Sequence, residues 1–230
     1  MNDKRNAVVQ KLYAEKREGY FQEVRQDVLE AIPLSNRKGS LLEIGAGGCR
    51  TLVYAKEKGF AEAVYGIDIM DCKPDADVQK KLNGLAIGDI QAMENLFDGM
   101  AFDVILCPDV LEHLVDPYSV VRKLREWLKE DGVVVASLPN INYWRVIFGI
   151  ILKNTFSYSD RGVLDRSHLR FFARKDVEAL FSENGFQVLA VSTNTGGWRG
   201  RIAQRLTGWL VGRFLAYQYI VVARPASAVN

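Results

Sequence analysis

The chain has 230 residues, 48% of them hydrophobic and 25% charged, which are ordinary proportions for one globular domain with a sizeable core. Lys and Arg total 30 against 28 Asp and Glu, and this near balance excludes the strongly basic surface that marks most nucleic-acid-binding proteins. Three cysteines without a CxxC spacing exclude a disulfide framework, argue against a zinc site and indicate reduced thiols in a cytoplasmic protein. The charged N-terminus predicts no signal peptide, and no apolar run approaches the about 18 residues of a transmembrane helix.

The predicted elements begin with a helix at residues 20–32, whose apolar side chains form one stripe and which Pro33 ends. Apolar runs then predict strands at residues 40–44, 63–67, 85–87, 102–107, 133–138, 186–191 and 216–223. Helices are predicted at residues 51–58, from Asp116 to Gly132, and at residues 175–184. Strands that alternate with helices predict a mostly parallel sheet with helices on both faces, and such sheets bind ligands at the carboxyl ends of their strands.

We expect one domain over residues 1–230 with an N-terminal helical segment at residues 1–36. Residues 140–172 and 196–215 interrupt the alternation of strands and helices. We expect these two stretches to be insertions that cover the active site as a cap.

A glycine-rich turn, Glu43-Ile-Gly45-Ala-Gly47-Gly48, joins the first predicted strand to a helix. Its glycines let the backbone turn tightly and let a ligand approach closely. Asp68 ends the second predicted strand, about 20 residues further on, where a carboxylate can accept both hydroxyls of a ribose. Asp89 ends the third and can accept a hydrogen bond from an adenine amino group. Acids at three successive strand ends therefore predict a nucleoside site.

Five stretches of the sequence resemble the motifs of class I S-adenosylmethionine (SAM)-dependent methyltransferases and occur in the same order as those motifs. They are Leu-Leu-Glu43-Ile-Gly45-Ala-Gly47-Gly, Val64-Tyr-Gly-Ile-Asp68-Ile, Gly88-Asp89-Ile90, Phe102 to Pro117, and Leu128 to Asn140. The resemblance implies a Rossmann-like fold, with a mostly parallel seven-stranded sheet, helices on both faces and a helical cap. It also implies SAM as the cofactor, a small-molecule acceptor and no nucleic-acid partner.

The resemblance also implies which residues contact SAM. The methionine end would lie against the glycine turn, the ribose and adenine beyond the second and third strands, and the amino-acid end beside the fourth. In this order the residues are Glu43, Gly45, Ala46 and Gly47; Asp68 and Ile69; Asp89 and Ile90; and the backbone near Cys107 and Pro108. Cys49 replaces a third glycine that many relatives have, so we expect altered helix packing behind the cofactor and retained binding.

Two other classes of protein are weighed against a methyltransferase. A dehydrogenase would place a helix N-terminus against a pyrophosphate, whereas Glu43, just before the first glycine, suits a ligand with an ammonium group. A methyltransferase-like SAM-binding module without catalysis is the non-enzyme alternative. The complete set of Glu43, Asp68 and Asp89 favours the enzyme.

The chain has two histidines, and each is a candidate base for a hydroxyl acceptor because imidazole titrates near neutral pH. His113 follows the fourth predicted strand. His168 lies in the connection after the fifth, where Asp165 is a candidate to orient it. For both histidines a structural role, as a loop cap or a packing residue, is the equally weighted alternative.

Asp109, Glu112 and His113 have a spacing at which they could bind a divalent cation, which would lower the pKa of a hydroxyl. Ubiquinone-pathway O-methyltransferases are similar here and imply such a site. Many relatives with Leu-Glu-His bind no metal, so we assign no metal ligands.

The region from Leu138 to Leu189, together with a closing stretch, resembles methyltransferases found with bacterial surface-polysaccharide biosynthesis. The resemblance is carried by Pro139-Asn140, the stretch from Gly162 to Phe172, Asn184-Gly-Phe, and Gln218 to Ala223. It implies a hydroxyl of a sugar or glycolipid intermediate as the acceptor. The alternative acceptor is a quinone or another aromatic hydroxyl, which a dependence on metal would favour.

Residues 143–153 and 198–217 mix apolar and basic side chains. We expect them to pack as a cap with the arginines facing solvent. The alternative is a peripheral membrane contact, in which a helix lies on anionic lipid. No feature of the sequence predicts an oligomeric state.

Overall fold

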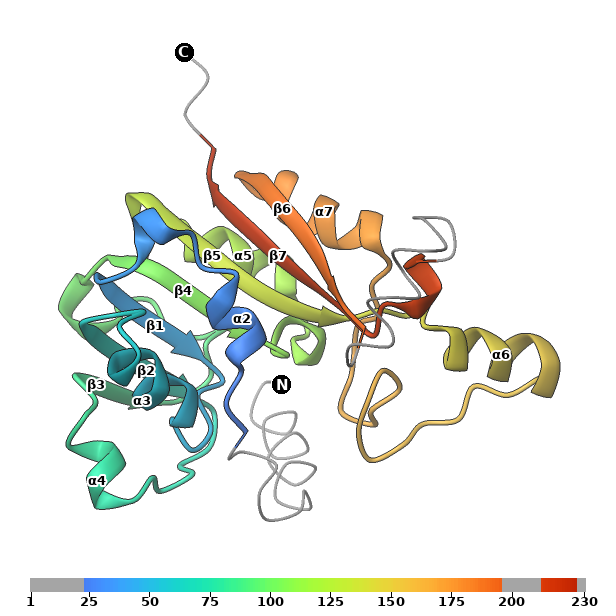
Figure 1. Cartoon of the computed structure of the whole chain (residues 1–230), viewed down its shortest axis with the longest axis horizontal. Coiled ribbons are helices and arrows are strands. Elements are labelled where there is room, and N and C mark those ends of the chain that lie inside the picture. The colour runs from blue at the N-terminus through green and yellow to red at the C-terminus, as the bar shows by residue number, and fades with distance from the viewer. Residues whose placement is uncertain (1–22, 196–211, 227–230) are drawn as a thin grey trace.

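The computed structural model describes residues 23–195 and 212–226. Seven strands form one sheet in the order β3-β2-β1-β4-β5-β7-β6 (Figure 1). The strands are β1 (Ser40–Ile44), β2 (Ala63–Asp68), β3 (Gly84–Ile87), β4 (Phe102–Pro108), β5 (Leu128–Pro139), β6 (Phe186–Asn194) and β7 (Gln218–Pro225). The helices are α2 (Gln26–Glu30), α3 (Arg50–Glu57), α4 (Ala76–Gln79), α5 (Pro117–Leu124), α6 (Trp144–Lys153) and α7 (Arg174–Ser182), with the 3-10 turns η2 (Leu34–Asn36), η3 (Phe97–Gly99) and η4 (Leu111–His113).

The sheet is mixed, because β7 runs against its neighbours. β1 pairs in parallel with β2 and β4, β2 with β3, and β4 with β5. β7 pairs antiparallel with both β5 and β6. The predicted Rossmann-like fold with seven strands is confirmed, with the qualification that the sheet is not wholly parallel.

Helices cover both faces of the sheet (Figure 1). The apolar residues of α2 and α3 form one buried layer with alternate side chains of the central strands, such as Leu41 and Val104. Those of α5 and α7 form the other layer, which includes Leu42 and Ile105. Consecutive residues of β1 and β4 thus point into opposite layers, which explains why these strands are almost continuously apolar.

The predicted helix at residues 20–32 is too long within the described residues. α2 begins only at Gln26, because Arg25 has the non-helical angles φ −85° and ψ 68°. The side chain of Arg25 pairs with Asp27 and with Asp109, which is distant in the sequence. These tertiary contacts override the local helical pattern. Residues 1–22 lie outside the described part of the chain.

The helix predicted from Asp116 to Gly132 is also too long. It ends at Leu124, and the turn signals around Gly132 lie inside β5. The register between β4 and β5 shifts after Phe102, and a Cβ on Gly132 would lie 2.9 Å from the carbonyl oxygen of Phe102. The glycine therefore accommodates an irregular strand pairing rather than ending a helix.

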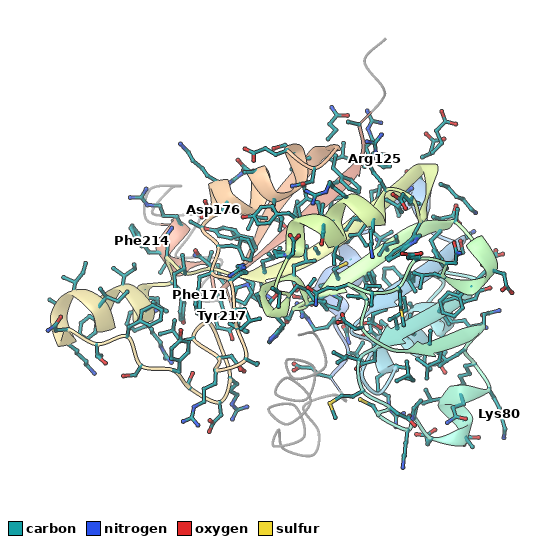
Figure 2. All side chains as sticks on the ribbon, turned by 180° about the vertical axis from the view of Figure 1, so that it is seen from behind. Lys80, Arg125, Phe171, Asp176, Phe214 and Tyr217 are labelled. Carbon is teal, nitrogen blue, oxygen red and sulfur yellow. The ribbon has the colours of Figure 1, made fainter. Side chains whose placement is uncertain are left out.

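Within residues 140–172, α6 projects from the body of the protein (Figure 1), whereas Val163, Asp165 and His168 are buried. Aromatic contacts support the base of this projection, where Phe171 and Tyr217 lie (Figure 2). The ring centroids of Tyr143 and Tyr217 are 5.5 Å apart, and those of Phe156 and Phe171 are 5.7 Å apart. Of the second predicted cap, residues 196–211 lie outside the described part. No helix within the described ranges is long and apolar enough to cross a bilayer.

Candidate cofactor and acceptor site

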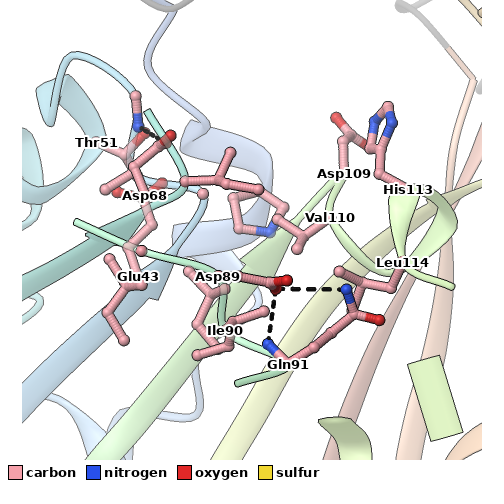
Figure 3. Close-up of a pocket in the computed structure, with 18 of the residues that line it drawn as sticks. Glu43, Thr51, Asp68, Asp89, Ile90, Gln91, Asp109, Val110, His113 and Leu114 are labelled. Atoms are coloured by element: carbon pink, nitrogen blue, oxygen red, sulfur yellow. Dashed lines mark hydrogen bonds between the residues drawn. The ribbon is translucent and has the colours of Figure 1, made fainter. Parts of the chain in front are cut away.

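A cavity of about 210 Å³ lies at the carboxyl ends of β1 to β4 (Figure 3). All of the predicted cofactor residues except Cys107 line it: Glu43, Gly45, Ala46, Gly47, Asp68, Ile69, Asp89, Ile90 and Pro108. The side chain of Cys107 is fully buried in the apolar core, and the prediction for this position concerns its backbone groups. The alternation of side chains along β4 explains this burial, since it turns Cys107 toward the layer of α5 and α7.

The glycine turn after β1 needs its glycines. Gly45 has φ +75°, and a Cβ on it would lie 2.6 Å from Val110 Cγ2. Cys49 has φ +58° and precedes the first residue of α3. A residue other than glycine in this left-handed conformation costs about 1 kcal/mol or more. The replacement of the third glycine thus adds backbone strain at the start of α3, with the Cys49 side chain fully buried.

Glu43 brings a buried carboxylate to the cavity wall. It is 2% exposed, and its Oε2 has no hydrogen-bond partner among the described residues. Burial raises the pKa of Glu43 to about 8, although a hydrogen bond with Thr51 and the charge of Arg25 oppose the shift. A ligand with an ammonium group would give this carboxylate the partner that it lacks.

Asp68 holds the cavity wall together. Its Oδ2 accepts a hydrogen bond of 2.7 Å from the backbone N–H of Gly47, and its Oδ1 accepts one of 2.8 Å from that of Met70. Burial raises the pKa of Asp68, and these backbone donors counteract the shift. The carboxylate thus joins the end of β2 to the glycine turn and retains acceptor capacity for ribose hydroxyls.

Asp89 lies across the cavity from the glycine turn (Figure 3). Its Oδ1 accepts hydrogen bonds of 2.9 Å from the backbone N–H of Gln91 and 3.3 Å from Gln91 Nε2. Ile90 follows as an apolar wall residue that is 6% exposed. Gln91 lines the cavity too, and the sequence reasoning missed it.

Arg25 is the site residue that sequence reasoning missed most completely. It lines the cavity, and its guanidinium pairs with Asp27 and Asp109 and donates to Ser137 Oγ at 3.1 Å. Gln218 Nε2 donates a hydrogen bond of 2.5 Å to the other oxygen of the Asp109 carboxylate. Burial lowers the pKa of Arg25, but the charges of Asp109 and Asp27 raise it by more, so the net shift is upward. No local pattern marks these residues, because they meet only in the folded chain.

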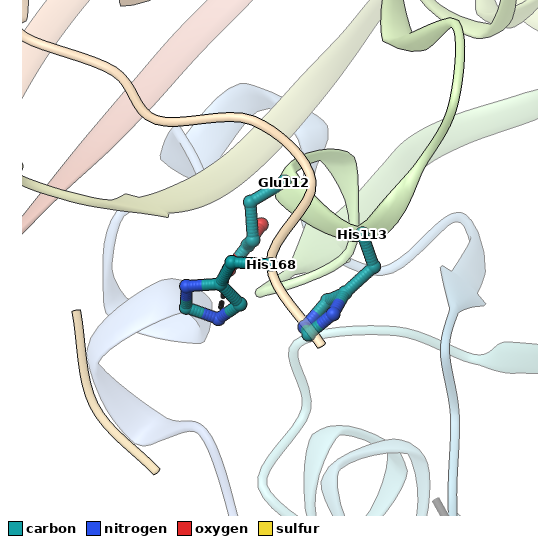
Figure 4. Close-up of side chains that lie close together, drawn as sticks. All are labelled: Glu112, His113 and His168. Carbon is teal, nitrogen blue, oxygen red and sulfur yellow. Dashed lines mark ion pairs between the residues drawn. The ribbon is translucent and has the colours of Figure 1, made fainter. Parts of the chain in front are cut away.

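The two histidines lie together, but only one lines the cavity. His113 does so, whereas His168 packs behind it with ring centroids 4.7 Å apart. The carboxylate beside the His168 ring is that of Glu112, whose Oε1 is 3.9 Å from His168 Nε2 (Figure 4). Asp165, the predicted orienting acid, accepts hydrogen bonds from the backbone N–H and the hydroxyl of Ser167.

Asp109 does not belong to the group of side chains that converge beside Glu112 and His113. Asp109 is bound to Arg25 and its neighbours. The side chains that converge are Glu112, His113 and His168, all buried, with one ligand atom of each within 4.8 Å of the others. Burial raises the pKa of Glu112, and the charge of Asp109 adds to this effect.

Comparisons with known proteins identify the family of the chain. A family model described as a methyltransferase domain matches residues 13–191. The ubiquinone biosynthesis O-methyltransferase of Rickettsia prowazekii is 29% identical over 133 residues, which are 53% of this chain and 52% of the relative. That of Rickettsia canadensis is 25% identical over 162 residues, 66% of this chain and 64% of the relative. The chain thus spans about half to two thirds of these curated relatives.

A solved structure supports the same fold. The 1,6-didemethyltoxoflavin-N1-methyltransferase of Burkholderia thailandensis, solved with S-adenosylhomocysteine, superposes with a TM-score of 0.65 at 14% identity, covering 96% of this chain and 87% of that one. Glu43 and Asp68 fit SAM, because the first lacks a cationic partner and the second can accept from a ribose. The chain therefore belongs to the methyltransferase-domain family, whose class I members use SAM as their cofactor.

Proposed function

We propose that the chain transfers the methyl group of SAM to a hydroxyl of a small acceptor, and that the acceptor is an aromatic hydroxyl of the kind found in quinone precursors. The observation that carries the proposal is the cavity itself, with nucleoside-type acids at one end and His113 at the other. The names of the curated relatives support the aromatic hydroxyl.

Each end of the cavity has a role in this proposal. Glu43 binds the methionine ammonium, and Gly45, Ala46 and Gly47 lie against the same end. Asp68 and Ile69 hold the ribose, Asp89 and Ile90 flank the adenine, and the chain near Pro108 lies beside the amino-acid end. The acceptor enters beside His113, with Leu114 and Val115 as apolar walls. The protein functions as one domain, with residues 140–172 as an insertion near the acceptor side.

The reaction is an in-line displacement. When bound, SAM supplies the methyl group: the new O–CH₃ bond forms as the S–CH₃ bond breaks, and that electron pair stays on sulfur to give a neutral thioether. The residues align the acceptor oxygen and exclude water. His113 and His168 together assist the departure of the hydroxyl proton, which leaves to solvent.

Replacing His113 by Ala should lower kcat by about 100-fold or more, the usual loss when a group that helps to deprotonate a nucleophile is removed. The affinity for SAM should change little, since the ring lies at the acceptor end of the cavity. Single-turnover methyl transfer and calorimetric titration with SAM measure the two effects. Unchanged turnover in this variant would contradict a role in the chemistry.

A methyl-transfer screen tests the acceptor. Catechols and other phenols, nucleotide sugars and glycolipids are each supplied with SAM, with and without divalent cations. We expect phenolic hydroxyls to be methylated. Methylation of a sugar alone would favour the surface-polysaccharide alternative, which the resemblance of the stretch from Gly162 to Phe172 supports. SAM binding without methyl transfer to any acceptor would favour the SAM-binding module, and absence of SAM binding would contradict the proposed function.

We also propose that α6 contacts an anionic membrane, which would bring the site to a lipid-borne acceptor. Its outer residues Ile151 and Leu152 are 71% and 69% exposed, and Trp144 is 45% exposed. Residues 141–159 contain no acid, whereas Arg145 and Lys153 are basic. Exposed apolar and aromatic side chains beside cations are the composition of helices that lie in a lipid interface.

Flotation with vesicles that contain anionic lipid tests this contact. The unchanged chain should float with the vesicles at low salt, and Ile151→Glu should remain in the soluble fraction. Leu34→Glu is the matched control, because Leu34 is 80% exposed in η2, away from α6. Equal flotation of all three proteins, or of none, would refute the contact through α6.

A further inference from the structure

Glu112 is a carboxylate in the interior of the protein. It is 1% exposed, and neither of its oxygens has a hydrogen-bond partner among the described residues. The distance of 3.9 Å to His168 Nε2 is too long for a hydrogen bond. An ionised carboxylate in such a place is destabilising unless a positive charge compensates it. A cation bound here would supply that charge.

The two histidines beside Glu112 have the orientation of metal ligands. His113 Nδ1 donates to the carbonyl oxygen of Ser167, and His168 Nδ1 donates to that of Val163, each at 3.0 Å. A neutral imidazole that donates from Nδ1 carries its lone pair on Nε2. Backbone carbonyls commonly hold metal-binding histidines in this way.

Backbone hydrogen bonds fix the three side chains relative to one another. The N–H groups of Leu169 and Arg170 donate to the carbonyl oxygen of Glu112 at 2.8 and 3.0 Å. Arg170 Nη2 donates to the carbonyl oxygen of Val115 at 2.6 Å. The segment that carries His168 is thus fastened to η4, which carries Glu112 and His113. The ligands are brought together before an ion binds.

We propose that Glu112, His113 and His168 bind one divalent first-row transition-metal ion, such as Zn²⁺, Mn²⁺ or Co²⁺. Their ligand atoms lie within 4.8 Å of one another. Metal–ligand distances of about 2.0–2.2 Å would require shifts of roughly half an ångström. Two imidazoles favour these ions over Mg²⁺, which prefers oxygen ligands and retains its water. Asp109 is not a ligand, since Arg25, Ser137 and Gln218 bind its carboxylate.

The site has a use in the proposed methyl transfer, on which this part of the inference rests. His113 belongs both to the cavity wall and to the cluster, so the ion would lie at the acceptor end of the cavity. The described residues supply three ligands, which leaves coordination positions for an acceptor hydroxyl. A hydroxyl bound to a metal ion loses its proton more readily, so with the ion bound the two histidines would assist deprotonation as its ligands and not as free bases.

The full chain is first stripped of metal with a chelator. Equilibrium dialysis against Zn²⁺, Mn²⁺ and Mg²⁺ then measures how tightly each ion binds. The visible absorption spectrum of bound Co²⁺ reports which ligands hold the ion. We expect one transition-metal ion per chain and much weaker Mg²⁺ binding. Loss of an outer partner of a ligand already weakens metal binding by about 10–100-fold. Glu112→Gln and His168→Ala should therefore weaken it by at least about 100-fold.

Two variants make the test specific. Asp109→Asn should keep the ion, because Asp109 is outside the cluster, and Glu126→Gln is the exposed control for the Glu112 change. SAM binding by each variant shows that it has folded. The absence of transition-metal binding, binding that survives in Glu112→Gln and His168→Ala, or binding lost in Asp109→Asn alone would overturn the site. Metal binding without methyl transfer to any acceptor would instead refute the proposed function and leave the site standing.

Discussion

Asp68→Ala should weaken SAM binding by about 1000-fold. Hydrogen bonds between a carboxylate and the two ribose hydroxyls are each worth about 1.5–3 kcal/mol. The same substitution leaves the N–H groups of Gly47 and Met70 without their acceptor, so the glycine turn loses its tie to β2. The substitution therefore removes the hydrogen bonds to the ribose and also disturbs the cavity wall that contacts SAM. Titration calorimetry with SAM measures the effect.

Asp71→Ala is the matched control for this prediction. Asp71 is exposed three positions further on, and its Oδ1 accepts from the N–H of Lys73 at 3.0 Å, a turn contact of the same kind. This variant should bind SAM like the parent chain. Circular dichroism of Asp68→Ala verifies its secondary structure. A folded Asp68→Ala variant whose SAM affinity stays within about threefold of the parent would rule out the proposed ribose contact.

Glu43→Gln should weaken SAM binding by about 200- to 4000-fold, because removing one partner of a buried ion pair costs about 3–5 kcal/mol. The parent chain should also release close to one proton on binding SAM near pH 6.5. Burial raises the pKa of Glu43 from 4.5 to about 8, so the carboxyl is protonated before SAM binds. The ammonium of SAM favours the carboxylate and expels that proton.

The direction of the pH dependence follows from this shift. Between about pH 4.5 and pH 8 the SAM-free folded chain holds a proton that the unfolded chain has lost, so this group's contribution to stability falls as pH rises. SAM affinity should rise over the same window, by up to about tenfold per pH unit, until the amino group of SAM itself deprotonates near about pH 7.7–8.0.

Calorimetry in buffers of different ionisation enthalpy counts the protons released. Glu57→Gln is the control, because Glu57 lies on the surface in α3 and pairs with Lys81. It should release the proton as the parent chain does, whereas Glu43→Gln should not. A pH-independent affinity in the parent chain would contradict the assignment of Glu43 to the ammonium.

The parallel strands and the cofactor wall are predictable because their signals are local. The runs at residues 40–44, 63–67 and 102–107 reappear as β1, β2 and β4 with bounds that differ by one residue at most. Strand ends in a parallel sheet meet at one edge, so acids at or just beyond the ends of successive strands, such as Glu43, Asp68 and Asp89, lie around one cavity.

The features that the sequence did not predict depend on contacts between residues that are distant in the sequence. Nothing near Arg25 in the sequence shows that its guanidinium will meet Asp109 and that α2 will begin only after it. His168 enters the cluster with Glu112 only because the segment after α6 folds back onto η4. The spacing of Asp109, Glu112 and His113 suggested one group of ligands, whereas the 3-10 turn separates the first from the other two.

The contacts of Arg25 affect the order in which the protein becomes able to bind its cofactor. Its guanidinium reaches Gln218, 193 positions away, and Ser137, 112 positions away. Contacts between residues so far apart in sequence form late, after the loops between them have closed. During synthesis β7 is the last described strand to be made, so a nascent chain without it lacks part of the support for this cavity wall. Stable cofactor binding should thus begin only once the C-terminal strand has joined the sheet.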